Sequence, residues 1–302
     1  MRNLVKCYDR QEVLKNISFK IGGAGVTGFL GPNGAGKSTI MKILSGLISP
    51  SSGSAEINGI DVLRNPKQAK AIVGYLPEHN PLYLDMYVKE FLYMTASVYG
   101  VKQKQKSVSK AIEMTGLAPE CGKKIGSLSK GYRQRVGIAQ NLLHNPEVLI
   151  LDEPTTGLDP NQIVEIRNLV KETGKEKTVM LSSHIMQEIE AVCDNVIIIN
   201  NGEIVADGIT SILKEQASRP AVEVEFLEKT DAATLEKSSF IEYAGLTESG
   251  SFLVRGYNNR DIRAELFGWA VENNLTIISL QKKEHKLEDI FRLLTKQNGS
   301  SI

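Results

Sequence analysis

The chain has 302 residues, of which 41% are hydrophobic and 24% are charged, as expected of a globular protein and not of a disordered one. This length predicts about two domains. The 36 Lys and Arg residues nearly balance the 35 Asp and Glu residues, so the net charge is +1 and no nucleic acid partner is expected. The three cysteines form no Cys-x-x-Cys pair, which is typical of ordinary thiols in a reducing cytoplasm.

No stretch of the sequence has the length of a membrane span. The longest apolar runs, such as Val148–Leu151 and Val196–Ile199, fall far short of the roughly 20 residues that a spanning helix needs. The first residues lack the apolar core of a secretion signal, so no secretion is expected.

Residues 1–215 alternate short β-branched runs with helical patterns, which predicts an α/β domain with a largely parallel sheet. The expected strands are Val26–Leu30, Ile72–Leu76, Val148–Leu151, Thr178–Ser182 and Val196–Ile199. A helix is expected from about Lys37, with Ile40, Ile43, Leu44 and Leu47 on its buried face. Between about residues 85 and 135 helical patterns such as Met86–Tyr99 and Ser107–Thr115 replace the strands, which predicts a helical insertion.

The pattern changes near Ser218-Arg219-Pro220, and residues 220–302 are expected to form a second, smaller domain. Its predicted strands are Ala221–Leu227, Phe240–Tyr243, Phe252–Arg255 and Leu275–Leu280, and its predicted helices are Asp231–Glu236 and Asp261–Glu272. The order βαββαβ predicts a ferredoxin-like α+β domain of the split βαβ type. A last helix is expected over Leu287–Thr295.

A glycine-rich loop of the form G-x-x-x-x-G-K-[ST] follows the first predicted parallel strand and opens the helix at Lys37. In this setting backbone N–H groups and the helix N-terminus point at phosphate oxygens. Lys37 would neutralise the β- and γ-phosphates, and the Ser38 hydroxyl would bind Mg²⁺. The expected nucleotide-binding residues of this loop are Gly31, Pro32, Asn33, Gly34, Ala35, Gly36, Lys37, Ser38 and Thr39.

Two adjacent carboxylates follow the most apolar strand of the predicted sheet. The run Val148–Leu151 ends directly at Asp152 and Glu153, which places both side chains at the carboxyl edge of the sheet, where α/β sheets bind ligands. Asp152 would hold Mg²⁺, and Glu153 would polarise the water that attacks the γ-phosphorus. The pair therefore predicts hydrolysis of the bound nucleotide.

Further motifs in the same order resemble those of the ATP-binding subunits of ABC transporters. Leu128-Ser129-Lys130-Gly131-Tyr132 resembles the family signature, and Gly157-Leu158-Asp159 resembles its D-loop. His184 resembles the switch histidine, and Tyr8 resembles the aromatic residue that stacks on adenine. The resemblance implies a P-loop NTPase cassette with a RecA-like core, ATP and Mg²⁺ as its cofactors, and a catalytic role for His184 beside Glu153.

The resemblance also implies two cassettes that close on two ATP molecules, either as a homodimer or with a different second cassette. Ser129, Gly131 and Asp159 would then reach the nucleotide of the opposite subunit. The insertion would receive a short helix of an integral-membrane permease subunit, which places the protein on the inner face of the cell membrane. The docking candidates, which otherwise pack the insertion's own core, are Leu82, Tyr83, Leu84, Met86, Tyr87, Phe91 and Leu92.

Three features depart from the family pattern. Glu78 stands where the family usually has a glutamine; its carboxylate can still bind Mg²⁺ but adds a negative charge beside the phosphates. Lys130 and Tyr132 replace a glycine and a glutamine of the signature. Only a few residues precede Tyr8, so the family's first strand is expected to be truncated or missing.

The leading functional hypothesis is the motor subunit of an ABC exporter. The βαββαβ tail followed by residues 287–291 resembles ABC-2-type export cassettes, and Tyr75–Tyr83 resembles the gliding-motility-associated members of that group. The alternative is a soluble ABC ATPase that acts on ribosomes or DNA, although such chains usually carry tandem cassettes, a coiled coil or a zinc hook. A binding module without turnover and a P-loop kinase explain fewer of the motifs.

Overall fold

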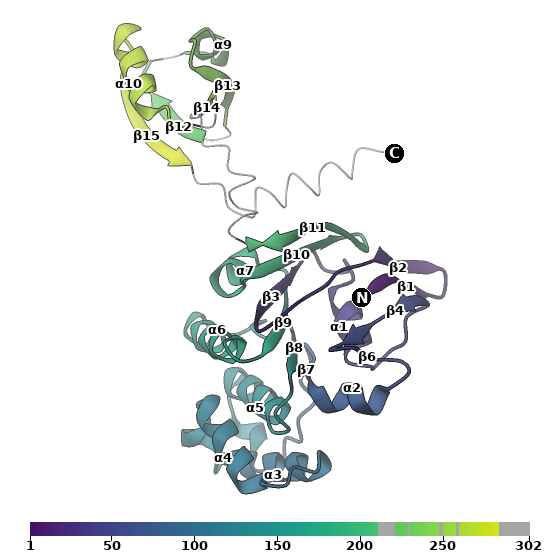
Figure 1. Ribbon diagram of the computed structural model, residues 1–302. Coiled ribbons are helices and arrows are strands. Elements are labelled where there is room, and N and C mark those ends of the chain that lie inside the picture. The colour runs from purple at the N-terminus through teal and green to yellow at the C-terminus, as the bar shows by residue number, and fades with distance from the viewer. Residues whose placement is uncertain (211–220, 229, 248–249, 258–259, 284–302) are drawn as a thin grey trace. The chain divides into compact units, whose positions relative to one another are not determined.

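The computed structural model describes residues 1–210, 221–228, 230–247, 250–257 and 260–283 (Figure 1). The chain divides into two compact units, Met1–Thr210 and Ser211–Ile302, and each has a hydrophobic core of its own. Among the residues that the structure describes, no helix combines the length and the apolar character needed to cross a membrane.

A six-stranded sheet forms the centre of the first unit, in the order β11-β10-β3-β9-β8-β7. The strands are β3 (Gly25–Leu30), β7 (Val73–Leu76), β8 (Val148–Asp152), β9 (Thr178–Ser183), β10 (Asn195–Asn200) and β11 (Glu203–Ile209). All neighbours run parallel except β11, which pairs with β10 in the antiparallel sense. The predicted parallel sheet is therefore confirmed, and the carboxyl ends of β3, β9 and β8 meet at one edge.

Helices cover both faces of this sheet. They are α1 (Lys37–Leu44), α2 (Pro66–Ile72), α5 (Lys130–Leu142), α6 (Pro160–Gly174) and α7 (Met186–Val192). Figure 1 shows α1 and α2 on one side of the sheet and α5, α6 and α7 on the other. Two local expectations are wrong: Ile72 ends α2 and does not belong to a strand, and Leu47 is 58% exposed because α1 ends at Leu44.

An antiparallel sheet of order β2-β1-β4 packs beside α1. Its strands are β1 (Arg2–Tyr8), β2 (Gln11–Ile17) and β4 (Ser52–Ser54), and a small hairpin of β5 (Glu56–Ile57) and β6 (Ile60–Asp61) follows. The expectation that the first strand is truncated or missing is wrong. Seven residues are enough for an average strand, and Leu4 of β1 is fully buried in the core shared with Phe29 and Ile40.

The helical insertion consists of α3 (Val88–Val98), α4 (Lys104–Met114), two short 3₁₀ turns (Ala118–Glu120 and Ile125–Ser127) and the first part of α5. The structure divides the docking candidates into two groups. Phe91 and Leu92 are buried in the insertion's own core, and Leu82 and Met86 pack against it. Three of the candidates remain exposed: Tyr83, Leu84 and Tyr87.

The described part of the second unit contains β12 (Ala221–Phe226), α9 (Ala232–Glu236), β13 (Ile241–Leu246), β14 (Phe252–Gly256), α10 (Arg263–Glu272) and β15 (Ile277–Lys283). Its sheet has the order β13-β14-β12-β15 with antiparallel neighbours throughout. In this order β14 lies between β12 and β13, the first two strands of the unit. This is the predicted split βαβ arrangement. The expected helix Leu287–Thr295 and the segment Ser218-Arg219-Pro220 lie outside the described residues.

Candidate nucleotide-binding site

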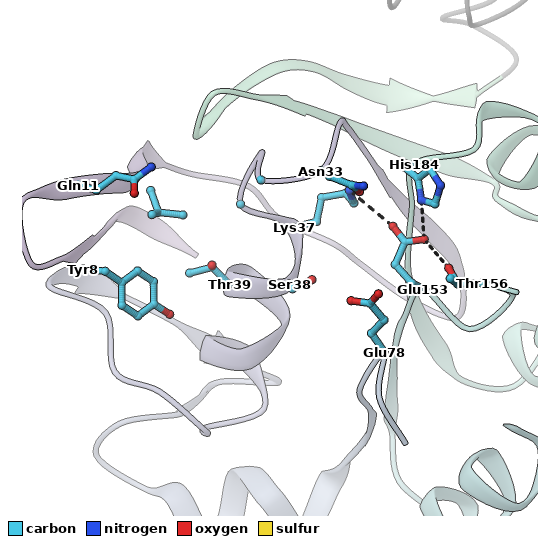
Figure 2. Close-up of a pocket in the computed structure, with 13 residues that line it drawn as sticks. Tyr8, Gln11, Asn33, Lys37, Ser38, Thr39, Glu78, Glu153, Thr156 and His184 are labelled. Carbon is cyan, nitrogen blue, oxygen red and sulfur yellow. Dashed lines mark hydrogen bonds and ion pairs between the residues drawn. The ribbon is translucent and has the colours of Figure 1, made fainter. Parts of the chain in front are cut away.

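A cavity of about 760 Å³ opens at the carboxyl edge of the central sheet (Figure 2). Its walls come from the end of β1 and the start of β2, from the glycine-rich loop with the start of α1, and from the loops after β7, β8 and β9. The lining residues are Tyr8, Gln11, Val13, Asn33, Gly34, Gly36, Lys37, Ser38, Thr39, Glu78, Glu153, Thr156 and His184. Residues that are far apart in the sequence thus converge on one space.

The glycine-rich loop, residues 31–38, bends sharply between β3 and α1. Gly34 and Gly36 have φ values of 82° and 107°, in the left-handed region that favours glycine. A Cβ atom on Gly36 would lie 2.5 Å from Leu14 Cδ2, so the loop also packs closely on β2. This bend brings the N-terminus of α1 to the cavity wall, and a helix N-terminus favours an anion such as phosphate.

Lys37, the first residue of α1, is only 5% exposed. Its Nζ donates hydrogen bonds to the carbonyl oxygens of Gly31 at 2.8 Å and Pro32 at 3.2 Å, and it lies 3.6 Å from Glu153 Oε1. Burial lowers the pKa of the Lys37 ammonium, and the nearby Glu153 carboxylate opposes this shift. Phosphate oxygens would add the negative charge that a poorly solvated ammonium group favours.

Glu153 makes polar contacts with Lys37, His184 and Thr156 in the cavity (Figure 2). Its Oε2 lies 2.9 Å from His184 Nδ1 and accepts a hydrogen bond from Thr156 Oγ1 at 3.1 Å. The backbone of Glu153 has a φ of 50°, a left-handed conformation that costs a residue with a side chain about 1 kcal/mol. The carboxylate is therefore held from three sides, by Lys37, His184 and Thr156.

Asp152 directly precedes Glu153 and is 2% exposed. Its Oδ1 accepts hydrogen bonds from Ser182 Oγ at 2.6 Å and from Ser38 Oγ at 3.0 Å. Ser182 in turn accepts a hydrogen bond from the backbone N–H of Glu153 at 2.9 Å. One buried serine of β9 therefore orients both residues of the acidic pair.

The oxygen donors near Asp152 fit Mg²⁺. Asp152 Oδ1 and Ser38 Oγ lie 3.0 Å apart, and burial, together with the nearby Asp152 carboxylate, raises the pKa of the Tyr75 hydroxyl. No group of three or more His, Cys, Asp or Glu side chains that could hold a metal ion occurs within the described ranges. Mg²⁺ commonly binds through one or two carboxylates together with substrate phosphates, and Asp152 and Ser38 suit that mode.

Tyr8 lies at the end of β1 and is 44% exposed at the cavity wall. The ammonium group of Lys6 lies 4.8 Å from the centroid of its ring. The structure thus brings Tyr8 to the cavity as the adenine-stacking hypothesis requires.

We expect Tyr8→Ala to weaken ATP binding by about 1 kcal/mol, or about fivefold in Kd, because an aromatic contact of this kind contributes energy of that order. Calorimetric titration with ATP measures the change. Tyr8→Phe keeps the ring and should bind as the natural chain does. Equal affinity of the alanine and phenylalanine variants would contradict stacking.

The residues expected to act on a partner's nucleotide do not line this cavity. Ser129 caps the N-terminus of α5, and Asp159 caps the N-terminus of α6. Gln162 joins the two caps: its backbone N–H donates to Asp159 at 3.0 Å, and its side chain donates to Ser129 at 3.4 Å. A Cβ atom on Gly131 would collide with the same Gln162 side chain, so the signature segment packs directly on α6.

Sequence reasoning missed several residues of the site. Gln11 and Val13 line the cavity from β2, the strand that follows Tyr8, and no local motif marks them. Thr156 and Ser182 contact the acidic pair through hydroxyl groups. Thr156 stands between the motifs at Glu153 and Asp159. That position is the only sequence signal from which Thr156 could have been identified.

The cavity, the glycine-rich loop and the parallel sheet define a P-loop nucleotide-binding protein. The sequence matches the family model described as ABC transporter over residues 14–156. The bacitracin transport ATP-binding protein BcrA of Bacillus licheniformis is 35% identical over 292 residues, covering 96% of this chain and 94% of that protein. The linearmycin resistance ATP-binding protein LnrL of Bacillus subtilis is 31% identical and covers 97% of this chain and 96% of its own length.

Solved structures show the same fold. CbiO1 from Clostridium perfringens, described as part of the ABC transporter complex cbiONQ, superposes with a TM-score of 0.64 at 30% identity, covering 71% of this chain and 90% of that one. The chain belongs to the ATP-binding subunits of ABC transporters, and it is an ATPase. The predicted cassette fold and the predicted use of ATP are therefore confirmed.

Proposed function

We propose that this ABC ATPase is the motor of an exporter, in which ATP binding closes two cassettes and hydrolysis reopens them. The observation that carries the hydrolysis step of this proposal is the contact of Lys37, His184 and Thr156 with one carboxylate, Glu153, at the wall of the cavity. Glu153 as general base therefore lies within 3.6 Å of the groups that orient it, His184 and Thr156, and of the phosphate-binding ammonium of Lys37.

Each side chain has one task in this mechanism. Gly34, Gly36 and the N-terminus of α1 bind the phosphates, while Lys37 exchanges its carbonyl partners for phosphate oxygens. Glu153 takes a proton from the attacking water, and His184 keeps the carboxylate and the γ-phosphate in line. Tyr8 stacks on the base.

Asp152 and Ser38 would hold Mg²⁺, with Glu78 as a further oxygen donor at the cavity wall. When bound, the ion would neutralise phosphate charge as negative charge shifts toward the leaving group.

The signature segment and the D-loop support a two-cassette arrangement. Ser129, Gly131 and Asp159 lie together through Gln162 but away from their own cavity, as expected of groups that serve the nucleotide of a partner. The N-terminus of α5 at Ser129 would face the partner's γ-phosphate. The second cassette is a copy of this chain or a different subunit.

An integral-membrane permease subunit completes the proposed exporter, which places the cassette at the inner face of the cell membrane. Tyr83, Leu84 and Tyr87 are exposed next to the insertion and offer the apolar contact surface. Relatives that match almost the whole chain carry names that include bacitracin transport and linearmycin resistance. The narrower assignment to gliding motility rests only on the segment Tyr75–Tyr83.

Affinity purification of the full chain from detergent-solubilised membranes tests the coupling. The proposal predicts recovery of a multi-span protein, and exchange of Tyr83 and Tyr87 for serine should reduce that recovery while leaving ATP binding unchanged. Recovery with ribosomes or DNA in place of a membrane protein would favour the alternative ABC ATPase function.

A further inference from the structure

Glu188 is a buried carboxylate that the proposed hydrolysis mechanism leaves without a role. It lies on α7 and is 3% exposed. Its Oε2 accepts hydrogen bonds from Thr155 Oγ1 at 2.6 Å and from Ser183 Oγ at 2.8 Å. Both partners are buried as well, so water does not compete for these two bonds.

The first bond connects Glu188 to the loop that follows β8. Thr155 stands two residues after Glu153, and its neighbour Thr156 donates to the Glu153 carboxylate. The carbonyl of Thr155 also accepts the backbone N–H of Leu158 at 3.1 Å, which shapes the turn toward α6. A shift of the Thr155 side chain would therefore move the segment that orients Glu153.

The second bond connects Glu188 to the loop that follows β9. Ser183 directly precedes His184, and its Oγ accepts the backbone N–H of Ile185 at 3.0 Å. The residues on both sides of His184 are thus tied to one hydroxyl, which donates to Glu188. We expect the orientation of the His184 imidazole to depend on these two hydrogen bonds of the Ser183 hydroxyl.

We propose that Glu188 is a positioning residue for ATP hydrolysis, which holds the loop after β8 and the loop after β9 in a fixed relation. The two loops then keep the Glu153 carboxylate and the His184 imidazole in contact at 2.9 Å. Glu188 does not line the cavity and acts only through Thr155 and Ser183. The inference rests on the proposed roles of Glu153 and His184.

An ionised carboxylate suits this role because both of its partners are hydroxyl donors, and such charge-assisted bonds are about twice as strong as neutral ones. Glutamine at position 188 keeps the shape but weakens the bonds. Thr155→Val removes one hydroxyl with little change in volume, and Thr155→Ser retains that hydroxyl.

Hydrolysis by the full chain at saturating Mg-ATP, measured beside the number of ATP-binding sites and the Kd from calorimetric titration, tests the proposal. We expect Glu188→Gln and Thr155→Val each to lower the rate constant about tenfold to hundredfold, because small misplacements of reacting groups have effects of that size. The number of ATP-binding sites per chain and the Kd for ATP should stay within about twofold. Thr155→Ser should restore the rate, and the double variant should be no slower than the slower single variant.

A purely structural role gives a different result: the number of ATP-binding sites falls with the folded fraction, while the hydrolysis rate constant per site is unchanged. That outcome, or a natural rate constant in Glu188→Gln, would overturn the proposal. Glu172→Gln on α6, an exposed carboxylate paired with Lys175, is the matched control and should change neither quantity. Absence of hydrolysis by the natural chain would instead count against the proposed motor function.

Discussion

Replacing Lys37 by alanine is expected to weaken ATP binding by about 3 kcal/mol, which corresponds to a rise of about 100-fold in Kd. The ammonium is buried at the N-terminus of α1, where water cannot replace it as a partner for phosphate. The substitution also leaves the carbonyl oxygens of Gly31 and Pro32 and the Glu153 carboxylate without their cation. The second effect lowers the stability of the free protein, because Lys37 exchanges its carbonyl partners for phosphate oxygens on binding, so the loss of affinity comes from the first effect.

Calorimetric titration of the variant with Mg-ATP measures this loss. Lys42→Ala is the matched control, because Lys42 lies on the same helix with its side chain exposed. The control should bind ATP as the natural chain does, and its thermal unfolding midpoint corrects for changes in helix α1. An unchanged affinity in Lys37→Ala would remove the glycine-rich loop as the phosphate site.

Replacing Glu153 by glutamine is expected to lower kcat about 10²- to 10⁴-fold while ATP binding is retained, because loss of a general base has an effect of that order. Glutamine keeps the size of the side chain and still accepts a hydrogen bond from Thr156. It cannot accept a proton from water. The His184 contact loses its charged partner as well, so the two groups that orient the water fail together.

Phosphate release by the variant measures kcat, and sedimentation with excess ATP measures assembly. Under the two-cassette proposal the variant should accumulate as nucleotide-bound dimers, since hydrolysis no longer separates them. Glu176→Gln, an exposed carboxylate beyond the end of α6, should retain activity and serves as the control. Rapid turnover by Glu153→Gln would contradict its assignment as the base, and single chains with every candidate partner would contradict the paired motor.

The parts of the site that local sequence determines could be predicted. The left-handed glycines, the helix start at Lys37 and the acidic pair after an apolar strand all lie within short segments, so their chemistry follows from spacing. The strand order could not be read from spacing, and it is this order that brings Ser182 of β9 beside Asp152 of β8. The bond between Glu153 and His184 depends on the same neighbouring strands.

At two other places the structure differs from the sequence-based expectation because tertiary packing decides the outcome. The few residues before Tyr8 predict a truncated or missing first strand, yet pairing with β2 and β4 and the burial of Leu4 stabilise a strand of seven residues. In the insertion the sequence shows a run of large apolar residues but not which of them face inward. The packing of α3 on α4 and α5 buries Phe91 and leaves Tyr87 at the surface.

The helix caps at Ser129 and Asp159 restrict what these two positions tolerate. Each side chain already accepts a backbone N–H of its own helix, from Tyr132 and Gln162 respectively, so alanine at either position would lower helix stability as well as any contact with a second subunit. Aspartate at position 129 separates the two roles. It would still cap α5, but its charge would repel the phosphates of a nucleotide bound to the facing subunit. The expected result is a well-folded protein that does not dimerise with ATP.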